Sequence, residues 1–414
     1  MNPRIPTKPA PQLCAMYGAN FINFQSNLSN MKHPPKITTE ELGDNAKVLN
    51  DFKRALELQQ LSNRTVNNYL WKNYQALLQY NKPAAEVTKT DIQDYIIKRR
   101  YSSSQWTVNG DIIALRKFYD WLKPGNDLFV GIKVKQPKNY LPVEQLITPD
   151  DVKKMLSVCK SQRDRAIIML LWDSGCRLNE VMSRNINHIQ PDEHGATMIV
   201  NGKTGMRKVR LIDSLPDVRL WLNQHPLKNN PDAPLFVTER RYDHKGGKVM
   251  EVRRVEDRTV QNMLKTVGKL AGINKDVHPH ALRHGRLTVF VRQGFLESEL
   301  RILAGWEKES NMPATYVHLA GADVDKKLLI KNGLITDDEE IVLKTLKPGK
   351  CPRCAADNPV DAKYCATCGL VLDKNVAKEI EDKSKLIPEV FAAMQSNPEF
   401  QKWFAEAISK VGKT

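Results

Sequence analysis

Hydrophobic and polar positions follow the helical period through the first third of the chain. From Asn45 onward, apolar residues recur every three or four positions, a spacing typical of helices with one buried face. Thr88 with Asp91 three residues later forms a capping-box signal at the start of one such helix. The pattern ends at residues 123–125, where Lys-Pro-Gly breaks any helix. We therefore expect four short helices in residues 45–124.

A second patterned region covers residues 148–335 and mixes two periods. Thr148-Pro149 marks a helix start, because proline is favoured in the first helical turn. Residues 186–212 change to the alternation of strands, and the turn-rich residues 201–205 form the expected tip of a hairpin. Helical signals return at 259–270, 281–293, 297–304 and 321–331. The pattern predicts a mixed α/β domain that is mostly helical.

The remaining segments divide the chain further. Residues 1–44 are polar and aperiodic, which favours a loose arm, and residues 125–147 have the composition of a linker. Residues 375–414 show helical spacing of apolar positions, as expected of a C-terminal helical tail. The fold class we predict is mainly α and multidomain, with a small metal-bound ribbon at residues 350–372.

Length and composition limit the class of protein. The chain has 414 residues, of which 41% are hydrophobic, and this is enough for two or three globular cores. Its longest apolar run is residues 166–172, far short of the roughly 20 residues that span a bilayer. The N-terminus shows no secretory signal pattern. We expect an intracellular, cytoplasmic protein with no membrane partner.

The charge is unevenly placed. The net charge is +16, with +6 on residues 45–124 and +9 on residues 148–335, whereas residues 336–414 carry −1. Basic surplus of this size favours a polyanionic partner, usually nucleic acid. The two patterned regions are therefore the expected DNA-binding part, and the tail is not.

Four of the seven cysteines form two closely spaced pairs, Cys351-x-x-Cys354 and Cys365-x-x-Cys368. In an intracellular chain this spacing indicates metal ligation, not disulfides. Four thiolates with no open position are typical of one structural zinc ion, and iron is the minor alternative. The neutral surroundings favour protein contact or local positioning over DNA gripping.

Three clusters in residues 148–335 combine residue types suited to phosphate chemistry. They are Gly175-Cys176-Arg177, His280-Ala281-Leu282-Arg283, and Gly305-Trp306 with Tyr316 ten residues later. Fixed cations aimed at non-bridging oxygens stabilise the transition state of phosphodiester attack. Arg177 and Arg283 suit this role because each guanidinium can donate two parallel hydrogen bonds to phosphate.

With Lys203 in the predicted hairpin, the order and spacing of these clusters resemble the tyrosine recombinase (phage integrase) family over about residues 45–335. The corresponding set is Arg177, Lys203, His280, Arg283, Trp306 and Tyr316. Residues 45–124 resemble the helical, SAM-like core-binding domain of that family. The motif around Tyr316 and the four-cysteine ribbon resemble integrases of archaea and their mobile elements. Trp306 stands where histidine is common, and its separation from Tyr316 is one residue longer than usual.

The resemblance implies the reaction and its partners. Tyr316 would attack the phosphodiester, giving a 3′-phosphotyrosyl link and a free 5′-hydroxyl without ATP or catalytic metal. Lys203 would be the general acid for the leaving oxygen. His280 would assist proton transfer at the tyrosine, and Trp306 would pack and donate from its indole N–H. The implied partner is double-stranded DNA, with a homotetramer assembled on two sites.

Several neighbouring residues have competing interpretations. Arg207 and Lys208 share the hairpin with Lys203, and we expect Glu180 to orient a catalytic side chain. We expect His284 and His318 to be structural.

A charged loop around Tyr242 makes that residue a poor nucleophile. With Arg253, Arg254 and Arg258 beyond it, the loop favours contact with the DNA backbone.

Two alternative functions share these residues: DNA relaxation of the type IB topoisomerase kind, and a non-catalytic DNA-binding regulator derived from a recombinase. The intact set of six argues against the second.

Overall fold

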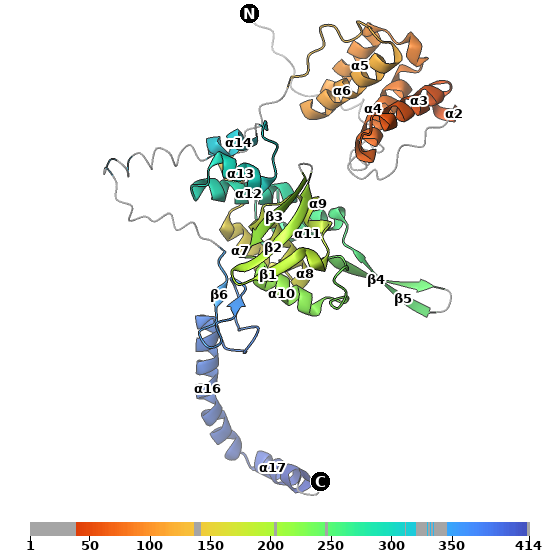
Figure 1. Cartoon of the computed structure of the whole chain (residues 1–414). Helices are drawn as coiled ribbons and strands as arrows, with labels where there is room; N and C mark the ends of the chain where they lie inside the picture. The colour runs from red at the N-terminus through yellow and green to blue at the C-terminus, as the bar shows by residue number, and fades with distance from the viewer. Residues whose placement is uncertain are drawn as a thin grey trace, which may run out of the picture. The chain divides into compact units, whose positions relative to one another are not determined.

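The computed structural model describes residues 39–135, 142–202, 205–244, 247–310, 312–319 and 346–411, together with Leu329, Asn332 and Leu334. The chain forms two compact units, Met1–Asn139 and Tyr140–Thr414. Helices dominate both, and the short strands lie in the second (Figure 1). The mainly helical prediction is therefore confirmed. In the described parts of the chain, no helix is long and apolar enough to cross a membrane.

The first unit is a small helical domain. Its helices are α2 (Thr39–Leu42), α3 (Asn45–Leu58), α4 (Asn63–Tyr80), α5 (Lys89–Ser102) and α6 (Gln105–Leu122), with the short 3-10 turn Ala84–Glu86. Ser62, Thr88 and Ser104 cap the last three α-helices, each accepting a backbone N–H bond three residues on. One apolar face of each long helix is buried in a common core.

Two segments expected to be loose are packed in this structure. Leu42, in the predicted arm, is buried in the core of the first unit because α2 lies against α3 and α4. In the predicted linker, Leu128 and Phe129 join the same core, whereas Leu146 and Ile147 are buried in the second unit. A single turn or a few apolar residues are too short to show a period, so the sequence pattern missed them.

The second unit is built around α8 (Gln162–Ser174), whose residues 166–174 are all buried. Its surrounding helices are α7 (Pro149–Val158), α9 (Leu178–Met182), α10 (Leu215–Gln224), α11 (Asp257–Leu270), α12 (Pro279–Arg292), α13 (Glu297–Ala304) and α14 (Met312–Leu319). Gly285 lets α12 lie close to the backbone of Ile147 and to the Trp172 ring on α8. A Cβ at this position would lie 2.2 Å from the carbonyl oxygen of Ile147 and 2.9 Å from the Trp172 ring. The predicted helix at 321–331 lies almost entirely outside the described residues.

A three-stranded antiparallel sheet lies next to these helices (Figure 1). Its strands are β1 (Ile189–Asp192), β2 (Gly195–Gly202) and β3 (Gly205–Leu211). The pairing of β2 and β3 continues to Gly202 and Gly205, so the predicted hairpin is present.

A second hairpin, of β4 (Val237–His244) and β5 (Gly247–Arg254), replaces the loop expected around Tyr242. Charged residues on many positions of these strands hid the alternation that normally reveals a strand. The loop prediction was wrong.

The C-terminal part contains a small ribbon and two helices. The ribbon has strands β6 (Gly349–Lys350) and β7 (Asp357–Asn358), which pair antiparallel. Helices α16 (Lys374–Gln395) and α17 (Pro398–Val411) follow. The predicted C-terminal helices are thus present.

Candidate functional site

Arg177 is placed by the way α8 ends. Gly175 adopts φ +57°, which closes α8 in a left-handed conformation and lets α9 start three residues later. The Arg177 Nη1 donates to Glu180 Oε1 at 2.9 Å and to the Gly305 carbonyl at 3.2 Å, while its backbone N–H donates to Glu180 Oε2 at 2.9 Å. A third of the Arg177 side chain, 34%, stays exposed. Its guanidinium is therefore oriented by protein groups and still reachable by a ligand.

Arg283 lies on α12 and is almost completely buried. Its Nη1 donates to the Gly175 carbonyl at 2.9 Å, and its Nη2 donates to the Ala304 carbonyl at 2.8 Å. The guanidinium also lies over the Trp306 ring, 5.6 Å from the centroid. Burial, followed by the charge of Arg177, lowers the pKa of Arg283 to about 10. The group stays cationic at neutral pH, and two crowded cations favour an anionic ligand.

Tyr316 on α14 is fully buried between two rings. It stacks on Trp306 at 5.4 Å and on His284 at 5.5 Å between centroids, and its hydroxyl lies 2.5 Å from His284 Nδ1. Burial raises the pKa of Tyr316 to about 12, although the charges of Arg283 and Arg177 oppose the rise. The phenol is thus protonated at neutral pH and is held beside the two cations.

His280 lies in the first turn of the same helix as Arg283 and remains exposed to solvent. Partial desolvation, then the charges of Arg283 and two other neighbours, lower its pKa. Its ring centroid lies 6.4 Å from that of His284. The structure therefore puts His280 at the edge of the site, and the hydrogen bond of Tyr316 goes to His284.

Arg207 on β3 also belongs to this site. Its Nη2 donates to Glu180 Oε2 at 2.8 Å and its Nη1 to Glu180 Oε1 at 3.2 Å. Glu180 therefore lies between Arg207 and Arg177. Burial alone would raise the pKa of Glu180, but the hydrogen bonds from Arg207 and Arg177 lower it to about 2. The single carboxylate orients two guanidiniums and offsets half of their combined charge.

The alternation of residues along β3 is itself a sequence signal for the position of Arg207. Val209 and Leu211 are buried and lie on the same face of β3 as Arg207, so alternation alone directs Arg207 inward. Gly305, at φ +60°, leaves room for it, since a Cβ there would lie 2.5 Å from Arg207 Nη1.

The other predicted site residues are placed unequally. Lys203 lies outside the described residues, as do the side chains of Tyr242 and His318. Arg253 and Arg258 are exposed.

Arg254 is engaged inside the protein. Its Nη1 donates to the carbonyls of Met182 and Arg184 at 2.7 and 2.6 Å, and its Nη2 donates to Asn185 Oδ1 at 2.6 Å. Its guanidinium therefore anchors β5 to the end of α9, which is a structural use that sequence spacing did not suggest.

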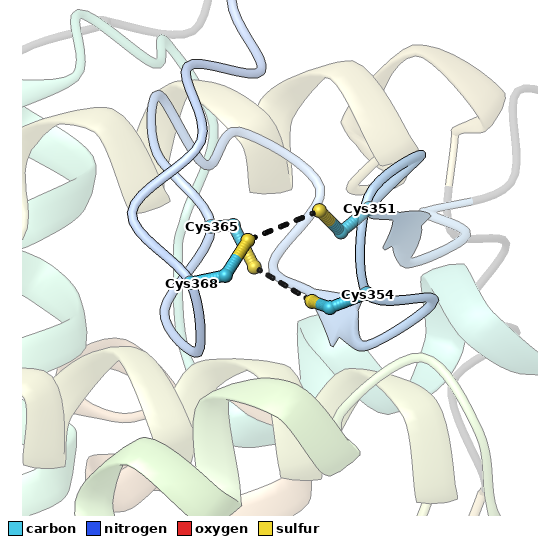
Figure 2. A group of neighbouring side chains, drawn as sticks. All are labelled: Cys351, Cys354, Cys365 and Cys368. Atoms are coloured by element: carbon cyan, nitrogen blue, oxygen red, sulfur yellow. Dashed lines mark hydrogen bonds between the residues drawn. The ribbon is translucent and has the colours of Figure 1, made fainter.

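The four cysteines of the ribbon converge on one point (Figure 2). Their sulfur atoms all lie within 4.8 Å of one another, and two pairs, Cys351–Cys368 and Cys354–Cys365, are 3.6 Å apart. Backbone N–H groups of Cys368 and Thr367 lower the pKa of Cys365, whereas hydrogen bonds with the other three thiols raise the pKa of Cys354. This cluster could hold a metal ion.

The ribbon is attached to the helical part of the second unit. Arg165 on α8 donates from Nη1 and Nη2 to the two carboxylate oxygens of Asp361, at 2.9 and 2.5 Å, and from Nε to Asp217 on α10 at 3.1 Å. Val360 packs on the core of the unit, and Leu346 is completely buried in it. The ribbon is thus fixed on α8 and α10.

Two family models match the chain. The phage integrase family matches residues 145–322, and the N-terminal SAM-like domain of phage integrase matches residues 49–125.

Curated relatives are tyrosine recombinases. XerA of Pyrococcus horikoshii is 26% identical over 275 residues, covering 66% of this chain and 89% of XerA. XerA of Saccharolobus solfataricus is 27% identical, covering 70% and 93%. XerC of Escherichia coli O157:H7 is 30% identical, covering 50% of this chain and 67% of XerC.

Solved structures agree in fold. The Tn1549 transposon integrase, in complex with transposon right end DNA, superposes with a TM-score of 0.51 at 15% identity, covering 67% of this chain and 98% of that chain. A lambda integrase dimer bound to a core site gives a TM-score of 0.50 at 15% identity, covering 64% and 96%. At these identities the likeness concerns the fold alone.

Replacing Glu180 by Gln should destabilise the second unit by about 3–5 kcal/mol, because two partly buried guanidiniums lose their counter-ion. The Glu180 carboxylate has a lowered pKa, so its contribution is present above the ordinary pKa of 4.5 and is lost as the pH falls through about 2. The difference in unfolding free energy between the two proteins should therefore shrink from pH 5 to pH 2. Denaturant melts at several pH values measure it. Glu193→Gln, at an exposed site, is the matched control; equal effects of both variants would contradict the role of Glu180.

Proposed function

The chain belongs to the tyrosine recombinase (phage integrase) family, and we propose that it recombines DNA at specific sites through a phosphotyrosyl intermediate formed by Tyr316. One observation carries this proposal: the Tyr316 phenol is buried close enough to the guanidiniums of Arg283 and Arg177 that their charges act on its pKa. A nucleophile, and cations that stabilise charge on phosphate, are the parts that transesterification of a phosphodiester needs.

The reaction is a balanced exchange of ester bonds. The Tyr316 oxygen attacks the scissile phosphorus, and the bond from phosphorus to the 5′-oxygen breaks. The phenol loses its proton, and the leaving 5′-oxygen gains one, which we assign to Lys203 as general acid. The product is a 3′-phosphotyrosine and a free 5′-hydroxyl. Because an ester replaces an ester, the strand can rejoin by the reverse reaction without ATP.

Each site residue has a role in this scheme. Arg177, which is partly exposed, and Arg283 would bind the non-bridging phosphate oxygens. Trp306 would hold the tyrosine ring by stacking and offer its indole N–H. His280 would assist proton transfer from its place at the edge of the site. The neighbouring carboxylate, Glu180, is already engaged by two arginines and is not arranged as a metal ligand, which suits chemistry without a catalytic metal.

DNA is the substrate that the charge distribution supports. The two basic regions, +6 on residues 45–124 and +9 on residues 148–335, contain the parts that match the family models. We propose that both contact duplex DNA, that binding weakens steeply with salt, and that four copies act on two sites. Because DNA is the proposed substrate, we propose the cytoplasm and its nucleoid as the location.

We assign the four-cysteine cluster to one structural zinc ion. Zinc–sulfur bonds of about 2.3 Å in a tetrahedron place sulfur atoms about 3.8 Å apart, close to the observed 3.6 Å pairs. The zinc would hold together a segment too short for a core of its own. Its docking through Asp361 supports a role in stabilising the helical unit.

Tyr316→Phe should abolish covalent attachment to DNA while leaving DNA binding unchanged, because only the nucleophilic oxygen is removed. The purified full-length protein is first incubated with DNA of its own genetic element, and cleavage sites are mapped at nucleotide resolution. A nicked substrate carrying the mapped site then traps the covalent complex. Tyr364→Phe, at an exposed tyrosine of the ribbon, is the control and should trap like the original protein.

The mapping also separates the proposed function from its alternatives. Cleavage at a defined site with recombinant products supports recombination. Relaxation of plasmids without preferred sequence would favour the topoisomerase alternative, and binding without cleavage would favour a regulator. Covalent trapping by the Tyr316→Phe variant would exclude Tyr316 as the nucleophile.

Removing the metal should lower the melting temperature of the second unit by several degrees, since the ribbon is docked on its core. The full-length protein should contain one zinc per chain by elemental analysis, and cobalt exchange should give the spectrum of a tetrahedral thiolate site. The Asp361→Asn variant should bind zinc normally, but chelation should lower its melting temperature by less than in the unsubstituted protein. In the Asp357→Asn variant, chelation should lower the melting temperature by the full amount. A melting temperature unchanged by chelation, or iron in place of zinc, would contradict the assignment.

A further inference from the structure

We propose that His284 is a further catalytic residue, which holds the hydroxyl of Tyr316 at rest and accepts its proton during attack on DNA. This inference rests on the proposed function and deepens it. The residue resemblance assigns proton transfer at the tyrosine to His280, and His284 was expected to be structural. The geometry points to the histidine one position after Arg283 as the direct acceptor of the proton, and leaves His280 an assisting place at the edge of the site.

The contact is direct and sheltered. The hydroxyl of Tyr316 lies 2.5 Å from His284 Nδ1, within hydrogen-bond reach of a general base. The two rings are stacked, with their centroids 5.5 Å apart and an interplanar angle of 30°. Tyr316 is fully buried, and His284 is partly buried. Bulk water is thus kept from the oxygen that must lose the proton.

The backbone fixes the position of His284. Its carbonyl accepts a hydrogen bond from Thr288 Oγ1 at 2.9 Å on the next turn of α12. The adjacent Arg283 is tied to the carbonyls of Gly175 and Ala304. The same helix turn therefore positions a phosphate-binding cation and the partner of the nucleophile.

The charges around His284 keep its imidazole neutral in the resting protein, with a nitrogen lone pair free to accept the hydrogen bond of the phenol. Burial, then His280 and Arg283, and then His278, lower its pKa to about 4, so the imidazole is neutral at physiological pH. All three of these groups come from the start of α12, and Tyr316 faces it from α14. A neutral imidazole that receives the phenol hydrogen at Nδ1 carries its own hydrogen on Nε2.

The proton has a defined path in both directions. As the Tyr316 oxygen bonds to phosphorus, its hydrogen moves to His284 Nδ1, and the resulting imidazolium lies beside the new phosphate ester. When the 5′-hydroxyl attacks to rejoin the strand, the imidazolium returns the hydrogen to the leaving tyrosine oxygen. No external acid, base or oxidant is needed.

The resting contact can be measured without DNA. In the full-length protein labelled with ¹⁵N-histidine, His284 should appear as the neutral tautomer with hydrogen on Nε2, and its Nδ1 signal should shift on Tyr316→Phe as the bond is lost. A His284 Nδ1 signal unchanged by Tyr316→Phe would overturn the contact. This outcome would leave the recombinase function itself standing.

The chemical role is tested by His284→Asn, because the amide oxygen can accept the phenol hydrogen bond but cannot take the proton. On the mapped DNA site, single-turnover cleavage should fall by about 10²–10⁴-fold. The rate of this variant should rise about tenfold per pH unit from pH 6 to 9, as the tyrosine ionises unaided, whereas the unsubstituted protein should show no such rise from His284. His194→Ala, at an exposed histidine on the β1–β2 turn, should behave like the unsubstituted protein.

A second substrate distinguishes the loss of the general acid from the loss of the general base. With sulfur in place of the bridging 5′-oxygen, the leaving group needs no acid. The cleavage rate of Lys203→Ala should therefore recover on this substrate, whereas the cleavage rate of His284→Asn should stay low. Recovery of His284→Asn on this substrate, or cleavage within about threefold of normal on ordinary DNA, would overturn the proposal. If the unsubstituted protein itself forms no covalent complex, the proposed function fails instead.

Discussion

The site depends on cations held against the carbonyl ends of two helices. Both α8 and α13 end in a glycine with a left-handed backbone, Gly175 and Gly305. Carbonyl groups at a helix C-terminus carry partial negative charge and lack partners within the helix. Arg283 donates to the ends of both helices, and Arg177 donates to the second. These carbonyl groups help to hold two guanidiniums close together, of which Arg177 also pairs with the carboxylate of Glu180.

The same arrangement explains the environment of Tyr316, the proposed nucleophile. Arg283 lies over the ring of Trp306, Trp306 stacks on Tyr316, and the hydroxyl of Tyr316 meets His284. Glu180 closes the other side, since it binds Arg177 and ties it to Arg207 on β3. A change in the position of either helix end would therefore displace the cations, the stacked rings and the hairpin together.

Sequence spacing predicted the elements with long, regular patterns and the residues that share a motif. Helices α3 to α7, the β2–β3 hairpin and the cysteine cluster were accessible in this way. The β4–β5 hairpin was not, because its many charged positions conceal the strand period. Short packed segments such as α2 were missed for lack of length.

Contacts between residues far apart in the sequence could not be predicted from residue spacing. Nothing in the spacing of Arg165 and Asp361, which are 196 positions apart, indicates that they meet. Likewise, the sequence indicates only a structural role for His284, whereas in the structure α14 places Tyr316 against it. Partner choice of this kind depends on tertiary packing, which a single sequence does not reveal.

The most direct test of the central claim is to identify the covalent adduct itself. The trapped complex of the full-length protein and its mapped DNA site is digested with trypsin and nuclease, and the nucleopeptide is sequenced by mass spectrometry. We predict one adduct, with the 3′-phosphate of DNA on the oxygen of Tyr316. An adduct on any other residue, or through a 5′-phosphate, would contradict the account.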